Sequence, residues 1–240
     1  MIDPVKTDSA ITRPGSLASA MPRGLFVFIL LYGGMTVLAG VLAFKQVQLW
    51  PTDLAVEAGI FAFLFLVVIS STIAQLYGEA LARRLVLWGF LPLGISALLI
   101  LLVLQLPASP EMLEYRSTDL AAFETVLAQT PRIMMAGPVA YLVSLLLNVW
   151  IFSRLSGSGS GSGGTLGLMV RGAVASALSQ AIDSVIFITL AFYGEFDITN
   201  LLIGQVIAKV ALSFVLVPFL ITIGVAFARW LDGRSVDEAR

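Results

Sequence analysis

The chain has 240 residues, of which 58% are hydrophobic and only 12% charged, and its mean hydropathy is +0.97. This composition excludes an ordinary soluble domain and indicates that lipid is the solvent for most of the chain. The formal net charge of -1 leaves no basic excess to neutralise phosphates, so a nucleic-acid partner is excluded as well. Cysteine and histidine are both absent, which removes thiolate nucleophiles, imidazole bases and the usual zinc and haem ligands. We therefore expect no cofactor.

The order of apolar runs predicts the fold class. Residues 1–23 are polar and contain Pro4, Pro14 and Pro22, which predicts a flexible leader. Six runs then have the roughly 20 residues that cross about 30 Å of hydrocarbon, and the first is too long for a signal-peptide core. They are Gly24–Phe44, Ala58–Tyr77, Leu85–Leu106, Ile133–Phe152, Val170–Tyr193 and Leu201–Ala228. The sequence predicts an all-α polytopic membrane protein, with a six-helix transmembrane domain over residues 24–230 and a tail over 231–240.

The distribution of cations predicts the orientation, because lysine and arginine near helix ends are retained in the cytoplasm. Ten cations lie in the leader, the 2–3 turn, the 4–5 linker and the tail: Lys6, Arg13, Arg23, Arg83, Arg84, Arg154, Arg171, Arg229, Arg234 and Arg240. The opposite loops hold Lys45, Arg116 and Arg132, together with eight acidic residues: Asp53, Glu57, Glu111, Glu114, Asp119, Glu124, Glu195 and Asp197. We therefore expect both termini in the cytoplasm.

Two connections have features of their own. In the outer loop Pro107–Thr130, Leu120, Phe123 and Leu127 recur at helical spacing, which suggests a short helix on the membrane surface, although a simple connector fits equally well. The inner linker contains Ser156–Gly164, an alternating Ser/Gly tract that predicts a flexible separation of four helices from two. The sequence leaves open whether this tract is native or an engineered spacer.

Helices 4 and 5 repeat a polar pattern at an offset of 35 residues, which aligns Ser144 with Ser179 and Asn148 with Asp183. Residues four apart lie on one helical face, so each helix carries a polar stripe. Internal repeats of this kind are typical of transporters, with the binding site where the repeats meet.

Two charges fall at membrane depth, Asp183 in helix 5 and Lys209 in helix 6. An unpaired charge there costs at least about 2.5–3.5 kcal/mol, so each needs an interior partner or a wet cavity. Two interpretations stay open: a buried ion pair that only fixes helix register, or a substrate or ion site.

The chain resembles the queuosine-precursor transporters, formerly grouped as putative vitamin uptake transporters, over roughly Gly59 to Leu220. The matching segments, in order, are Gln75-Leu76-Tyr77-Gly78 with Ala82-Arg83-Arg84, Pro131-Arg132-Ile133 with Ala140-Tyr141, Ser179-Gln180-Ala181-Ile182-Asp183-Ser184 through Phe187 to Gly194, and Ala208-Lys209 leading to Pro218. The resemblance implies inner-membrane uptake of a 7-deazaguanine, namely preQ0 (cyano), preQ1 (aminomethyl) or queuine. Ser71, Gln75, Leu145 and Asn148 depart from the family's usual residues, which leaves Asp183 as the sole deep carboxylate expected.

The resemblance also implies a set of substrate contacts. Asp183 would accept the N–H and NH2 of a guanine-like edge. Gln180 and Asn148 would hydrogen-bond to the carbonyl and ring nitrogens of the solute, and Phe187 or Tyr141 would stack on its ring. The remaining substrate-binding residues expected are Ser179, Gln75 and Lys209. The expected partners are this small molecule and the lipid bilayer, and a homo-oligomer stays open.

Other functions remain to be distinguished. The runner-up is a substrate-binding membrane subunit that needs a separate ATP-driven module, because the chain has no nucleotide motif. A purely structural protein would leave the deep charges unexplained. An intramembrane enzyme would have only a Ser213–Lys209 dyad, since histidine and a second deep aspartate are missing. We therefore predict that the protein is not an enzyme.

Overall fold

The structure is a computed structural model that describes residues 21–157 and 165–233. The side chains of residues 145, 148–149, 152–157 and 165–173 are outside this description. Nearly all of the predicted leader, most of the Ser/Gly linker (158–164) and most of the tail (234–240) therefore lie outside the described residues.

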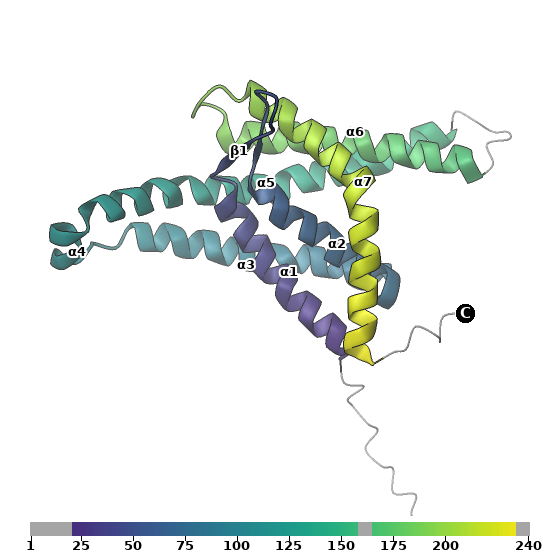
Figure 1. Ribbon diagram of the computed structural model, residues 1–240, viewed down its shortest axis with the longest axis horizontal. Coiled ribbons are helices and arrows are strands. Elements are labelled where there is room, and N and C mark those ends of the chain that lie inside the picture. Colours follow the sequence, from purple (N-terminus) through teal and green to yellow (C-terminus); the bar gives the residue numbers. More distant parts are fainter. Residues whose placement is uncertain (1–20, 158–164, 234–240) are drawn as a thin grey trace, which may run out of the picture.

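Seven helices and one short hairpin make up the described chain (Figure 1). In chain order they are α1 Arg23–Leu42, β1 Gln46–Gln48, β2 Ala55–Glu57, α2 Gly59–Tyr77, α3 Glu79–Leu104, α4 Pro110–Tyr115, α5 Ser117–Gly157, α6 Thr165–Phe192 and α7 Thr199–Asp232. Each of the six predicted spans falls on a helix. In the part of the chain that the structure describes, five helices are long and apolar enough to cross a membrane: α1, α2, α3, α6 and α7. The protein is thus an all-α polytopic membrane protein with a small hairpin added.

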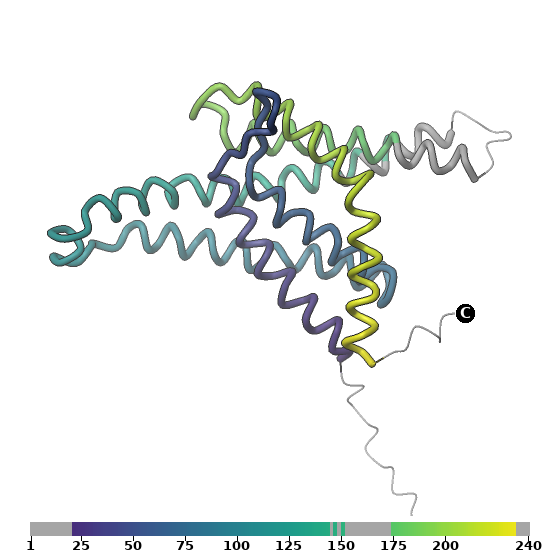
Figure 2. The backbone as a smooth tube through the Cα atoms, in the orientation of Figure 1, coloured from purple at the N-terminus to yellow at the C-terminus, as the bar shows by residue number. Residues whose placement is uncertain are grey.

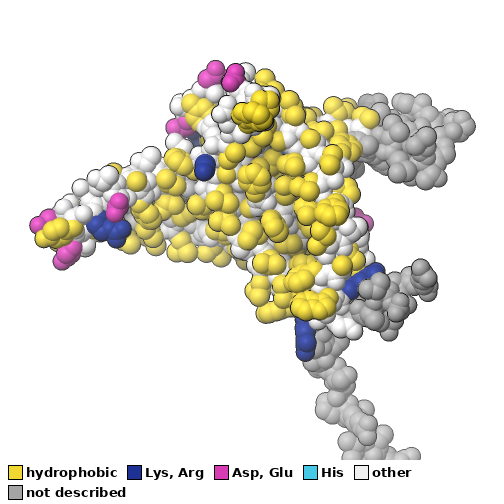
Figure 3. Space-filling model, viewed as in Figure 1, with side chains coloured by type: hydrophobic (Ala, Val, Ile, Leu, Met, Phe, Trp, Pro, Cys, Tyr) yellow, Lys and Arg dark blue, Asp and Glu magenta, His cyan; other side chains and the backbone are white. Residues whose placement is uncertain are grey.

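The exposed side chains of the helices are those expected of a membrane protein. Large apolar side chains such as Phe26, Trp88, Leu98 and Val215 are exposed on three different helices, where only lipid would favour them. Figure 3 shows apolar side chains over most of the visible face, while acidic ones gather mainly near the hairpin, the α6–α7 loop and α4. The helical body therefore has the polarity of a membrane-embedded protein.

The helices are arranged as a long antiparallel pair crossed by the others. α3 and α5 run side by side to α4, and α1 packs across both (Figure 1). α2 packs against α1 and α3, α6 packs along α5, and α7 packs against α1, α2 and α6. At the opposite end from the hairpin, the start of α1 and the end of α7 meet (Figure 2), and the backbone N–H of Gly24 donates to Asp232 Oδ1 at 2.7 Å. The two ends of the described chain therefore lie together.

Local chemistry explains the boundaries. Gly78 separates α2 from α3 with φ 100°, a left-handed conformation that side chains beyond glycine rarely adopt. Ser109 caps α4 by accepting from the backbone N–H of Met112 at 3.3 Å, with Pro110 at the first helical position. The interval around Leu120 is helical, but it is the beginning of α5 and continues into the predicted fourth span. The separate surface helix or simple connector expected there is therefore wrong.

The hairpin was not predicted from the sequence. β1 and β2 pair antiparallel, with Val47 opposite Val56. β2 lies against α7 at Gly204, where a Cβ would overlap the backbone carbonyl of Ala55. This close approach places Glu57, at the end of β2, inside the protein.

Candidate functional site

A cavity of about 180 Å³ lies between the helices, lined by side chains from all six long helices and β2. A space of about 150 Å³ in an engineered protein holds benzene, so this one admits a small ring compound. The lining is apolar except for a few groups, as in most small-molecule sites. From α1 to α7 its polar and aromatic members are Tyr32, Thr36, Glu57, Phe63, Ser70, Phe90, Tyr141, Asp183, Phe187 and Lys209.

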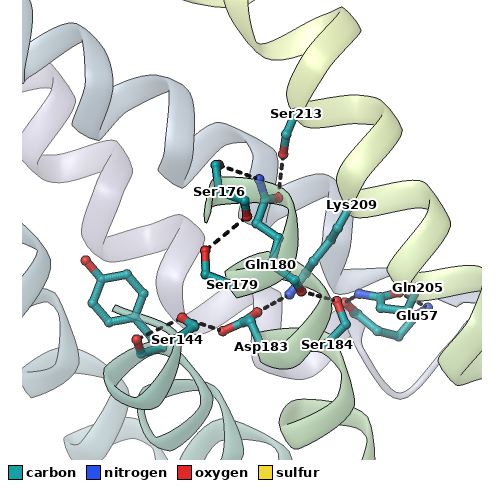
Figure 4. A network of polar contacts seen from close by, with 11 residues as sticks. Glu57, Ser144, Ser176, Ser179, Gln180, Asp183, Ser184, Gln205, Lys209 and Ser213 are labelled. Carbon is teal, nitrogen blue, oxygen red and sulfur yellow. Dashed lines mark hydrogen bonds and ion pairs between the residues drawn. The ribbon is translucent and has the colours of Figure 1, made fainter. Parts of the chain in front are cut away.

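At one wall of the cavity, α6 and α7 are joined by a buried ion pair (Figure 4). Lys209 Nζ donates to Asp183 Oδ2 at 2.6 Å, and the two side chains are only 6% and 13% exposed. Ser144 Oγ, from α5, lies 3.3 Å from Asp183 Oδ1 and 2.9 Å from the backbone carbonyl of Tyr141, and its one proton can be donated to either acceptor. The pairing predicted for Asp183 and Lys209 is confirmed, and both deep charges face the cavity.

A chain of polar contacts extends the pair along α6. Gln180 Nε2 donates to Ser176 Oγ at 3.3 Å, and Ser213 Oγ on α7 donates to Gln180 Oε1 at 2.6 Å. Ser179 Oγ donates to the backbone carbonyl of Ser176. Ser213 thus bonds to Gln180 while Lys209 bonds to Asp183, so the two do not form a nucleophile and base dyad.

Glu57 is a second buried carboxylate, which the sequence analysis placed in an outer loop. Its side chain is 3% exposed, and Gln205 Nε2 donates to its Oε1 at 2.6 Å while its backbone N–H donates to Gln205 Oε1 at 3.2 Å. Asp183 is thus not the only buried carboxylate that faces the cavity, although Glu57 lies on β2, outside the apolar spans. The available signal was Gln205, a polar residue one turn before Lys209 on an otherwise apolar helix.

Burial raises the pKa of the Glu57 carboxyl to about 7. The ammonium of Lys209, the amide of Gln205 and the backbone amides of Gly59 and Ile60 each lower this pKa without offsetting the desolvation. The Glu57 carboxyl therefore changes its charge near neutral pH, in the wall of the same cavity.

Aromatic rings surround the charges. Lys209 Nζ lies 4.5 Å from the ring centroid of Phe63 and 5.7 Å from that of Phe187, within the range of cation–π attraction. Tyr141 meets Phe90 edge to face with centroids 5.8 Å apart. Phe63 was missed from the sequence because an aromatic residue in an apolar helix carries no signal of which face it occupies.

The predicted site residues divide into three groups. Asp183, Lys209, Tyr141 and Phe187 line the cavity. Gln180 and Ser179 lie in the polar chain beside it, and Gln75 is exposed near the end of α2, outside the lining. The side chain of Asn148 is outside the described residues. Within the described part of the chain, no three acidic side chains come together as a metal ion would need.

A mostly apolar cavity between membrane helices, with a few charged and polar groups in its wall, is typical of a membrane transporter. The family model described as "Putative vitamin uptake transporter" matches residues 57–223, and the chain belongs to this family. It is also 28% identical over 202 residues to the "Probable queuosine precursor transporter" of Bacillus subtilis (strain 168), covering 82% of this chain and 81% of that protein. No solved structure matches the chain. The protein is therefore a multi-pass membrane transporter rather than an enzyme, and the resemblance found from the sequence is confirmed.

Proposed function

We propose that this transporter imports a nucleobase-like solute, a 7-deazaguanine precursor of queuosine, across the inner membrane. The observation that carries the proposal is the cavity in which the Asp183–Lys209 pair faces aromatic rings. A guanine-like solute presents N–H and NH2 donors on one edge and a flat face for stacking, which suit a carboxylate and a ring. The similarity to the probable queuosine precursor transporter of Bacillus subtilis supports the same substrate class.

Asp183 is the proposed acceptor for the donor edge of the solute. Its Oδ2 already accepts a hydrogen bond from Lys209, while its Oδ1 shares the Ser144 hydroxyl with the backbone carbonyl of Tyr141. A carboxylate oxygen has a second lone pair, so each can take a further donor from a solute in the cavity. The ion pair with Lys209 fixes the position of the carboxylate, while Phe187 and Tyr141 offer the aromatic faces.

Six membrane crossings with both termini in the cytoplasm belong to the proposal. The start of α1 and the end of α7 lie together, as an even number of crossings requires, and the sixth crossing is the Ile133–Phe152 interval of α5. A reporter fused after Arg240 should be active in the cytoplasm, and one inserted within 111–119 should be active outside. The reverse pattern would contradict the orientation.

The uptake experiment uses the purified protein alone in liposomes. Time-dependent accumulation of a 7-deazaguanine is expected without any added ATPase. Adenine-type analogues should compete poorly, because their edge has an acceptor where guanine has an N–H. Binding without uptake until a partner ATPase is added would indicate the substrate-binding subunit instead, and binding of neither base class would refute the proposed substrate.

A further inference from the structure

The charges that face the cavity do not balance. Its titratable lining groups in the described chain are Lys209 on α7, Asp183 on α6, Glu57 on β2, Tyr32 on α1 and Tyr141 on α5. With both carboxyls ionised and both phenols neutral, two negative charges face one positive charge. Excess buried charge is costly in a low-dielectric interior, so a proton or a bound cation must offset it.

The unmet acceptor is on Glu57. Asp183 Oδ2 accepts from Lys209, which also offsets its charge, and the Ser144 hydroxyl lies within reach of Oδ1. Glu57 Oε1 accepts from Gln205, and the backbone amides of Gly59 and Ile60 lower the pKa of the carboxyl, but Oε2 is fully buried and no described side chain donates to it. A buried carboxylate oxygen without a side-chain donor is expensive, so this atom is where a donor from a solute would be stabilised most.

We propose that the cavity is selective for a solute with a positively charged amine, that this amine binds Glu57 Oε2, and that Glu57 of the empty cavity holds a proton below neutral pH. The inference rests on the proposed function and narrows it to the aminomethyl 7-deazaguanine over the cyano one. The aminomethyl group is a primary amine and carries a proton at neutral pH, whereas the cyano group is neutral and only accepts. Where Glu57 is protonated, its proton leaves for the solvent on binding and the ammonium replaces it as the counter-charge; where Glu57 is already ionised, the ammonium binds the carboxylate directly.

The pH dependence has a definite sign. Above a pKa of about 7 the Glu57 carboxyl is ionised and attracts the amine; below it the carboxyl is protonated and the attraction is lost. Affinity for the aminomethyl solute should therefore fall as the pH is lowered from about 8 to about 6, while affinity for the cyano solute should not fall with it. Other titratable groups also face the cavity, namely Lys209, Asp183, Tyr32 and Tyr141. If the pH dependence of the affinity disappears in the Glu57→Gln variant, Glu57 is the group that causes it.

The test measures the affinity of both solutes for detergent-purified protein by calorimetry. At about pH 8 the parent should bind the aminomethyl form at least about tenfold more tightly, the effect of one charge-assisted hydrogen bond. Glu57→Gln should abolish this preference, whereas Glu111→Gln, an exposed change on α4, should keep it.

The outcomes separate the inference from the proposed function. Equal binding of both solutes by the parent, or an undiminished preference in Glu57→Gln, overturns the inference and leaves a deazaguanine transporter. Binding of neither solute overturns the proposed function itself. If Glu57→Gln does not fold, the parent protein alone still tests the inference. A preference for the aminomethyl over the cyano solute that does not fall between about pH 8 and about pH 6 would exclude Glu57 as the counter-charge.

Discussion

The cavity wall and the outer surface of this protein contain the same two kinds of polar contact. A lysine or arginine pairs with an aspartate in both places: Lys209 with Asp183 inside at 2.6 Å, and Arg116 with Asp119 outside at 3.0 Å. A glutamine donates to a glutamate in both places: Gln205 to Glu57 inside, and Gln129 to Glu195 outside at 3.1 Å. Distances are similar, but the exposed ion pair has side chains 67% and 62% exposed and the buried pair 6% and 13%.

The difference teaches that solvation, not geometry, decides what each contact does. Water can replace either partner of the exposed contacts, so these add little. Inside the protein nothing replaces a lost partner, and the remaining group keeps its full desolvation penalty. Polar groups retained at this cost near a cavity are candidates for binding rather than for stability.

The largest expected effect is on stability. Lys209→Ala leaves Asp183 buried without its counter-charge and should lower the free energy of unfolding by roughly 3–5 kcal/mol. The double variant Asp183→Asn with Lys209→Ala should be milder, because no charge is stranded. Denaturant unfolding in detergent measures both, and strictly additive effects would show that the two residues are not coupled.

Next is the effect of Asp183→Asn on binding. The amide replaces one acceptor oxygen by an NH2, which opposes the donor edge of a guanine-like solute. Losing a charge-assisted hydrogen bond costs about 1.5–3 kcal/mol, so the affinity for 7-deazaguanines should fall at least about tenfold. Asp119→Asn, the exposed counterpart, is the control and should bind like the parent. Unchanged affinity in Asp183→Asn would make Asp183 structural.

A smaller effect is expected at the glutamines. Gln205→Leu removes the donor to Glu57 and should destabilise the protein by about 1–3 kcal/mol, limited by protonation of the carboxyl. Gln129→Leu removes the same kind of contact at the surface, where water takes its place, and should change stability much less. Thermal unfolding of the two variants side by side gives the comparison, and equal losses would show that burial does not matter here.

The smallest effect is expected at the exposed ion pair. Arg116→Ala should change the free energy of unfolding by no more than about 1 kcal/mol, and this change should shrink further at high salt. A loss as large as that of Lys209→Ala would indicate that the α4–α5 end is buried against another surface.

The sequence by itself determined the membrane class, the positions of the six long helices and the two buried charges of α6 and α7. These follow from the length and polarity of continuous runs, because lipid tolerates neither exposed backbone nor isolated charge. It also determined the family, through the motif around Asp183 and the segment at Lys209.

Only the tertiary structure decided which polar residues share a cavity. Glu57 lies far from Gln205 in sequence, and the approach of β2 to the backbone at Gly204 buries them together. Gln75, with the same polarity as Gln205, stays exposed. Residue type fixes the cost of burying a side chain, but which side chains are buried depends on long-range packing, which no local pattern contains.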